Sequence, residues 1–188
     1  RMKKWILTVF LLIFFTAFSS EKRISDIKNL AFSTQEILVV NGKERETKYD
    51  IKFQVPDKIK KEITFPELNK GELYIYNKNE KTIYLPIFHQ ITHEKISNDE
   101  NRIIEVINYI FEKEKKDINF RKKYYNSEIK EISLDDGVKI KFDKFEKING
   151  YILPVSFELF DDEIKIGIIN IKNYQINPEF DGKEFVLE

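Results

Sequence analysis

The stretch Thr47–Phe65, TKYDIKFQVPDKIKKEITF, decides the fold of this chain, because hydrophobic and polar residues alternate through it in two runs. The first run places on one face Tyr49, Ile51, Phe53 and Val55. The second places on one face Ile59, Ile63 and Phe65, a row that Lys61 interrupts. A period of two is that of a half-buried antiparallel strand. The short Pro56-Asp57 turn predicts that the two strands are neighbours, with their apolar rows side by side.

The same alternation continues on both sides of this stretch. Asn41-Gly42 and Asn149-Gly150 are hairpin signals, and Asp161-Asp162 marks another turn. About ten strands joined by short turns predict an antiparallel sheet that curls around its apolar face, a mainly β fold with some α. The other strands are expected at 37–40, 73–76, 82–85, 88–96, 128–134, 138–142, 155–159, 164–174 and 185–187.

One strongly amphipathic helix is predicted over residues 98–116. Ser97 and Glu100 form a capping box, with Ser97 as the N-cap. Helical spacing then gives the stripe Ile103, Ile107, Ile110 and Phe111. A second, short helix is expected within residues 21–32, and the charged stretch 113–123 is interpreted as a solvated helix end and loop.

The N-terminal 20 residues have the pattern of a secretory signal peptide. Met2-Lys3-Lys4 is a positive start, Trp5–Phe15 is an 11-residue apolar run, and small residues precede a cut after Ser19 or Ser20. The alternative is an uncleaved anchor, but spanning a bilayer takes about 20 apolar residues. The expected organisation is a signal peptide over 1–20 and one domain over 21–188, with 29 basic and 32 acidic residues after cleavage.

Composition excludes several classes of protein. A hydrophobic content of 41% with 14% aromatic residues is too high for a disordered chain. The 32 basic and 32 acidic residues balance, which argues against a nucleic-acid binder. The absence of Cys removes disulfides, thiolate metal sites, cysteine nucleophiles and lipid attachment to an N-terminal Cys.

Candidate catalytic and metal-binding residues are few. His89 and His93, four apart on an expected strand, would lie about 13 Å apart, too far to share a metal. The pairs Asp135-Asp136 and Asp161-Asp162 flank turns, where Asp is favoured for its own hydrogen bonding. No nucleophile elbow, dinucleotide-binding or phosphate-loop motif occurs. We therefore expect no metal, no cofactor and no catalysis.

The order of motifs from about residue 24 to 188 resembles that of LolA-type outer-membrane lipoprotein carriers. Pro56–Ile63 follows the family's proline and its run of alternating apolar and charged residues, with Lys60 where an Arg is usual and Glu62 matching the acid. Tyr84–Gln90 fits the family's Tyr-x-Pro-x-x-x-Gln. Leu153-Pro154 opens a later strand, and Asn177-Pro178 and Phe185 stand near the end.

This resemblance implies an incomplete antiparallel barrel with a helical lid over an apolar cavity that holds acyl chains. It implies a soluble, monomeric periplasmic protein that carries lipoproteins from an inner-membrane release complex to an outer-membrane receptor. The expected cavity wall is Tyr49, Ile51, Phe53, Val55, Ile59, Ile63 and Phe65, with Lys61 at the rim. The expected lid residues are Ile103, Ile107, Ile110 and Phe111.

Two departures bear on this function. Val55 stands where many family members have an Arg associated with lid closure, and the Trp usual beside the second motif is absent. The alternative function is an exported subunit that senses lipid or lipoprotein on the same fold and binds a membrane regulator. An exported hydrolase is disfavoured by the lack of a paired nucleophile and base.

Overall fold

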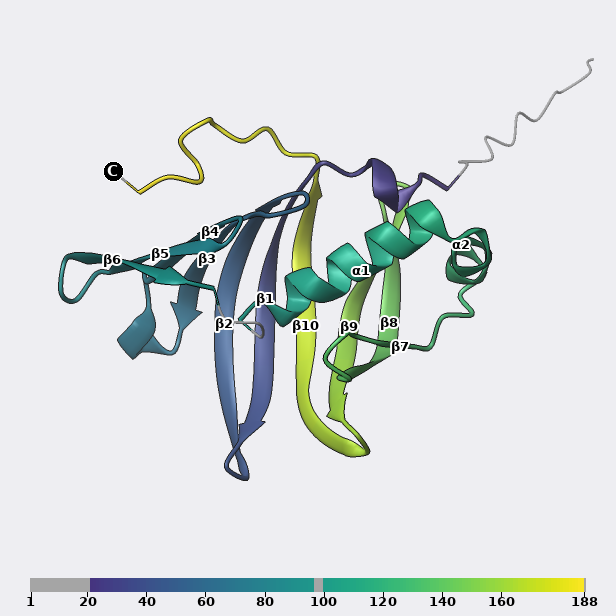
Figure 1. Cartoon of the computed structure of the whole chain (residues 1–188), viewed down its shortest axis with the longest axis horizontal. Coiled ribbons are helices and arrows are strands. Elements are labelled where there is room, and N and C mark those ends of the chain that lie inside the picture. The colour runs from purple at the N-terminus through teal and green to yellow at the C-terminus, as the bar shows by residue number, and fades with distance from the viewer. Residues whose placement is uncertain (1–20, 97–99, 188) are drawn as a thin grey trace, which may run out of the picture.

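The computed structural model describes residues 21–96 and 100–187, and within them ten strands form one antiparallel sheet that does not close (Figure 1). Two short 3₁₀ turns, η1 (Ile24–Asp26) and η2 (Glu67–Asn69), and two helices, α1 (Arg102–Lys116) and α2 (Ile118–Tyr125), complete the fold. The strands are β1 (Asn29–Val40), β2 (Lys43–Gln54), β3 (Lys58–Phe65), β4 (Leu73–Asn77), β5 (Glu80–Leu85), β6 (Gln90–Lys95), β7 (Glu131–Ser133), β8 (Lys139–Ile148), β9 (Tyr151–Asp161) and β10 (Ile164–Ile176). This is the mainly β fold with an incomplete barrel that the sequence predicts.

The strand order explains why a helix covers the sheet. It runs β6-β5-β4-β3-β2-β1-β10-β9-β8-β7, so β6 and β7 lie at opposite edges although they are consecutive strands in the chain. The segment that joins them must cross the whole sheet, and this segment contains α1 and α2. Figure 1 shows α1 lying diagonally over one face, which we call the inner face, while β4, β5 and β6 extend to one side as a wing.

The hairpins form where the turn residues predicted them. Asn41 and Gly42 have φ angles of 52° and 71°, and Asn149 and Gly150 have φ angles of 51° and 89°. Both residues of each turn therefore have left-handed backbone angles. In the first hairpin, β1 and β2 pair without a shift from Asn29↔Gln54 to Val40↔Lys43.

The first helix and the last strand that the sequence predicted are absent. Residues 21–32 form the turn η1 and the start of β1, in which Leu30 and Phe32 pair with Phe53 and Ile51 of β2. Their alternation with Ala31 is the period of a strand, which the helical reading of the segment overlooked. The closing strand at 185–187 is also absent; Phe185 instead packs edge-on to Phe180 and is 9% exposed.

The helical segment begins later and extends further than predicted. Glu100 lies in a turn and Asn101 is the N-cap of α1, whereas the predicted N-cap Ser97 lies outside the described residues. The charged stretch expected to be a loop contains α2. Its N-cap Asp117 accepts hydrogen bonds from the backbone N–H groups of Asn119 and Phe120, at 2.9 and 3.1 Å, which specifies the helix start locally.

One hydrophobic core joins the inner face of the sheet to the helices. It includes residues of β1, β2, β3, β8, β9 and β10 together with the buried stripe of α1 and Tyr124 of α2. Neither helix in the described part of the chain has the length and hydropathy of a transmembrane span.

Candidate functional site

The inner face of β2 and β3 carries the two apolar rows that the alternation predicted. Tyr49 is paired with Ile63 and Phe53 with Ile59, which confirms that the rows are neighbours. Phe53 is 0% exposed, and the other members of the rows on these strands are almost as buried: Tyr49, Ile51, Ile59 and Ile63. Val55, just beyond the end of β2, is half-buried and packs against the core.

Phe65 does not belong to these rows. The register shifts between Lys48 and Tyr49, so that Phe65 pairs with Lys48 on the outer face of the sheet. Its ring is 39% exposed, and the Lys48 ammonium lies 5.2 Å from the ring centroid. This shift is a β-bulge with one extra residue in β3 between Ile63 and Phe65, and it turns Phe65 to the opposite face of the sheet. The alternation of the sequence gives no sign of the bulge.

The predicted lid residues all point into the core. Ile103, Ile107 and Ile110 are each 1% exposed, and Phe111 is 5% exposed. They share one hydrophobic cluster with Ile51 and Phe53 of the sheet. In this state the side chains of α1 belong to the same packed core as the wall residues, so an apolar ligand that enters this core would have to displace them.

Lys61 lies on the inner face within the second row, where it is paired with Ile51 of the first. Its ammonium sits 4.1 Å from the centroid of the Tyr49 ring, a cation–π contact that partly offsets the loss of water. Burial lowers the pKa of Lys61, while the negative charges of Glu36 and Glu100 act in the opposite direction. The Tyr49 hydroxyl donates to Glu36 at 3.2 Å. Lys61 is thus held among these groups and the core.

A second lysine of the inner face is fully paired. Lys81 is 7% exposed, and its ammonium lies 3.0 Å from a Glu94 carboxylate oxygen and 2.8 Å from one of Glu100. Since Glu100 precedes α1, this ion pair ties the start of the helical segment to β5. Sequence reasoning missed it, because Lys81 was expected outside the strand that it belongs to.

A pocket opens on the inner face beside the covered core. Its volume is about 440 Å³, and wall residue Ile63 and the Tyr74 ring border it with Arg45 and Thr47 of β2. Glu72 accepts a hydrogen bond of 2.7 Å from the Tyr74 hydroxyl. The pocket therefore combines apolar with polar and charged side chains, and Ile63 links it to the core that the rows share with α1.

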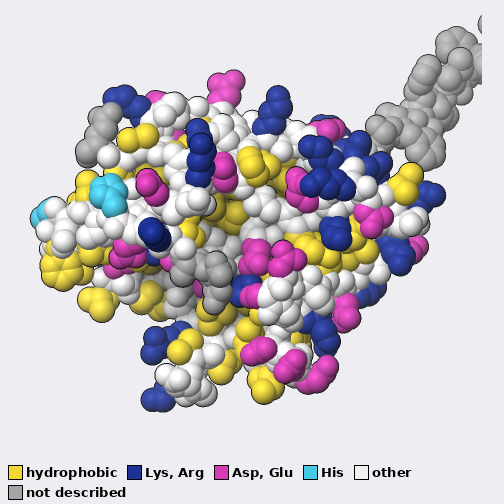
Figure 2. All heavy atoms as spheres, in the orientation of Figure 1, with side chains coloured by type: hydrophobic (Ala, Val, Ile, Leu, Met, Phe, Trp, Pro, Cys, Tyr) yellow, Lys and Arg dark blue, Asp and Glu magenta, His cyan; other side chains and the backbone are white. Residues whose placement is uncertain are grey.

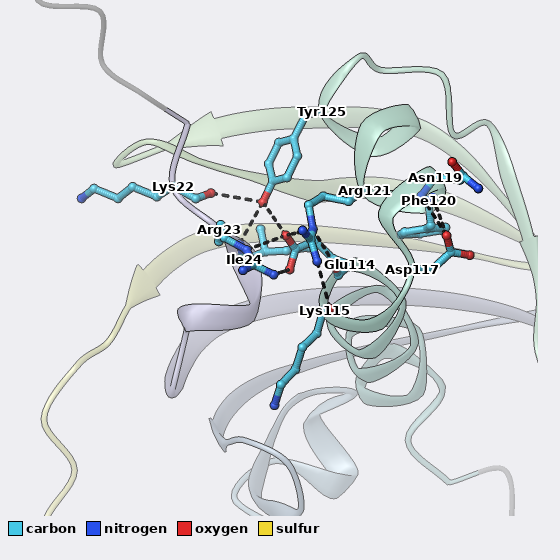
Figure 3. Close-up of polar contacts among 10 residues, drawn as sticks. All are labelled: Lys22, Arg23, Ile24, Glu114, Lys115, Asp117, Asn119, Phe120, Arg121 and Tyr125. Carbon is cyan, nitrogen blue, oxygen red and sulfur yellow. Dashed lines mark hydrogen bonds and ion pairs between the residues drawn. The ribbon is translucent and has the colours of Figure 1, made fainter.

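The C-terminal end of α1 is fixed by a buried carboxylate. Glu114 is 0% exposed, and its oxygen lies 3.1 Å from Arg23 Nε and 3.2 Å from Arg121 Nε (Figure 3). The Tyr125 hydroxyl is 3.5 Å from the same oxygen and accepts a hydrogen bond from the Ile24 backbone N–H. Burial alone would raise the pKa of Glu114, but the hydrogen bonds and charges of its partners lower it overall.

Along the rest of α1, the polar contacts described next reach solvent. Arg102 pairs with Asp136 in the turn between β7 and β8, at 2.8 Å, and with Glu105 one helical turn on. Asn108 donates to the backbone carbonyl of Pro56, at 2.9 Å, across an exposed contact. The helix is therefore anchored most deeply at its C-terminal end, around Glu114.

Two of the polar residues singled out as catalytic or metal-binding candidates, His93 and Asp136, have structural partners. His89 is not on a strand; it follows Phe88 in the turn before β6 with φ of 46°. His93 is on β6, where its ring nitrogen lies 3.1 Å from the Thr82 hydroxyl. Asp136 also accepts from the Val138 backbone N–H. Among the described residues, no three His, Cys, Asp or Glu side chains gather as metal ligands.

Solved structures resemble the whole fold. A LolA superfamily protein from Nitrosomonas europaea matches 89% of this chain and 96% of its own, at 12% identity and a TM-score of 0.62. A DUF1329 family protein from Desulfovibrio piger matches 86% and 91%, at 10% identity and a TM-score of 0.57. An outer membrane lipoprotein-sorting protein domain from Vibrio parahaemolyticus matches 89% and 92%, at 9% identity and a TM-score of 0.53. No protein-family model and no curated protein matches the sequence. The chain has a LolA-like fold.

Proposed function

We propose that this protein is a periplasmic carrier that binds the acyl chains of lipoproteins and moves them from the inner to the outer membrane. The observation that supports this most is the buried stripe of α1 lying against the inner face of an open sheet. The proposed wall is Tyr49, Ile51, Phe53, Val55, Ile59 and Ile63, and the proposed lid residues are Ile103, Ile107, Ile110 and Phe111.

The physical basis of the proposal is an exchange of one apolar surface for another. Each CH₂ group of an acyl chain costs about 0.8 kcal/mol in water, so a carrier needs an apolar wall of matching area. When α1 lifts, the wall loses the helix stripe and gains the acyl chain. The two states then bury similar areas, and this allows the cargo to be released again.

The proposed route requires export and transient partners. We propose cleavage after Ser19 or Ser20, a monomer in the periplasm, and successive contact with an inner-membrane release complex and an outer-membrane receptor. N-terminal sequencing of the protein from the producing cell tests the first step, and a chain that still begins at Met2 would contradict it. We propose no catalysis: Asp136 and His93 are engaged in the structural contacts described above.

Two adjacent residues of β3 provide the test. Ile63 faces inward at 6% exposure, whereas Thr64 is exposed and borders a pocket on the outer face. We expect the wild type to bind an apolar fluorescent probe that a fatty acid or an acylated peptide displaces. Ile63→Glu should lose this binding, since a carboxylate would be desolvated beside the ligand, and Thr64→Glu should keep it.

Mass spectrometry of lipid or lipoprotein co-purified with the wild type identifies the cargo. A wild type that binds no probe, or equal loss in the two variants, would contradict the carrier function. Stable capture of a membrane regulator, without transfer of acylated cargo between vesicles, would instead support the sensing function.

A further inference from the structure

The far end of the wing exposes an unusual share of the large hydrophobic side chains. Ten such residues are exposed in the described chain, and five of them come from two loops and the strand ends beside them. These five are Phe65 at 39%, Leu68 at 74%, Ile87 at 62%, Phe88 at 71% and Ile91 at 41%. Figure 2 shows hydrophobic side chains gathered at this end of the molecule, at the left of the view.

The two loops lie side by side. The backbone N–H of Gly71 donates to the Ile63 carbonyl at 2.8 Å, which closes the loop of residues 65–71. A Cβ atom added to Gly71 would lie 3.6 Å from Pro86 Cγ, so this loop touches the loop of residues 85–90. We call these two loops, with Ile91, the wing tip.

The wing tip is suited to an interface between water and hydrocarbon. Its backbone groups are largely paired internally: Phe88 N–H donates to the Leu85 carbonyl at 3.2 Å, and Asn69 N–H to the Pro66 carbonyl at 3.0 Å. A paired backbone lowers the cost of leaving water. The charges of Glu67 and Lys70 are also paired, at 3.4 Å, so the tip carries little net charge.

The shape of the wing tip favours a lipid surface over a protein partner. Leu68, Ile87 and Phe88 project from turns instead of lining a groove, and each is more than 60% exposed. Protruding side chains of this kind can enter a fluid layer that closes around them, whereas a folded protein would need matching pockets. Tyr84, which pairs with Ile91 and is half-buried, adds a ring of the amphipathic type that prefers the headgroup region.

We propose that the wing tip inserts into the surface of a phospholipid bilayer and docks the protein there reversibly. This goes beyond the proposed carrier function and does not depend on it, because no residue of the wing tip belongs to the proposed wall. The contact would place the open pocket beside Ile63 and Tyr74 near the membrane that supplies or receives acyl chains.

A single tryptophan reports the insertion directly. Residues 21–188 hold every described element and contain no Trp, since the only Trp of the chain is Trp5. In this chain, Phe88→Trp should shift its emission to shorter wavelength when phosphatidylcholine vesicles are added, and brominated acyl chains should quench it. Ile164→Trp is the control, because Ile164 is 70% exposed at the β9–β10 turn, away from the wing.

Co-sedimentation with the same vesicles tests the energetics. Replacing Ile87 and Phe88 together by Ser should lower the partition coefficient by at least about tenfold, while Ile164→Ser should leave it unchanged. Circular dichroism confirms that the variants fold. The proposal is overturned if the wild type stays in the supernatant, or if the variant with Ile87 and Phe88 replaced by Ser sediments like the wild type. It is also overturned if the emission of Phe88→Trp and that of Ile164→Trp respond alike to vesicles. Phe53→Glu changes the proposed wall and not the wing tip, so it should keep vesicle binding. Failure of the carrier function can therefore be distinguished from failure of membrane docking.

Discussion

Ile107→Ala tests whether α1 competes with the ligand for the wall of the inner face. Ile107 is 1% exposed in the middle of the helix stripe, and it packs in the same cluster as Ile51 and Phe53. Truncating such a side chain costs about 2–4 kcal/mol. For a domain of this size, that lowers the melting temperature by about 10 °C.

The same truncation should strengthen ligand binding. The lost contacts belong to the state in which α1 covers the wall, so the equilibrium shifts toward the uncovered state. A loss of about 2 kcal/mol raises the ratio of uncovered to covered protein about thirtyfold. The apparent affinity for an apolar probe increases by up to that factor when the covered state dominates. Thermal unfolding and fluorescence titration of the probe give the two quantities for one variant.

Ile51→Ala is the matched control. Ile51 is also 1% exposed and loses the same atoms, but it belongs to the wall and not to the helix. The variant should be destabilised by a similar amount without a gain in affinity. The reason is that the helix in the covered state and the ligand in the uncovered state both lose their contact with the Ile51 side chain. If both variants gain affinity, or if Ile107→Ala weakens binding, α1 does not compete with the ligand and the lid interpretation is wrong.

Three further predictions concern stability and metal binding. Glu114→Gln should cost about 2 kcal/mol near neutral pH, because Glu114 accepts charged hydrogen bonds from Arg23. The pKa of Glu114 is lowered in the folded state, so this contribution is complete above the unfolded pKa of about 4.3 and disappears as the pH falls through the lower folded value. Chemical denaturation of both proteins across that range should show the difference between their free energies of unfolding shrink toward zero. A difference that stays constant with pH would contradict the prediction. Gly167→Ala should cost about 1–3 kcal/mol in thermal unfolding, because its Cβ would lie 2.6 Å from Leu38 Cδ2 and 2.9 Å from the Ile37 carbonyl oxygen; a variant as stable as the wild type would show that β1 and β10 can separate there. Elemental analysis should find no stoichiometric zinc, and zinc that is lost in the His89→Ala, His93→Ala double variant would contradict this.

Local sequence patterns determined the elements whose structure depends on near neighbours. The alternation of Tyr49, Ile51 and Phe53 specifies a strand with one buried face, because side chains of a strand alternate between its two faces. Asn41-Gly42 specifies a hairpin, because both residues accept left-handed backbone angles. The stripe from Ile103 to Phe111 likewise specifies a helix with one buried side.

Only the tertiary structure decided how these elements meet. The pairing of β1 with β10 puts β6 and β7 at opposite edges, and this carries α1 across the inner face. Glu114 stands within a run of charged residues, yet it is buried, and Arg23 and Arg121 reach it from other elements. The bulge that turns Phe65 outward belongs to the pairing of two strands. Such features arise from contacts between residues far apart in the chain, and the pattern of any one segment does not contain them.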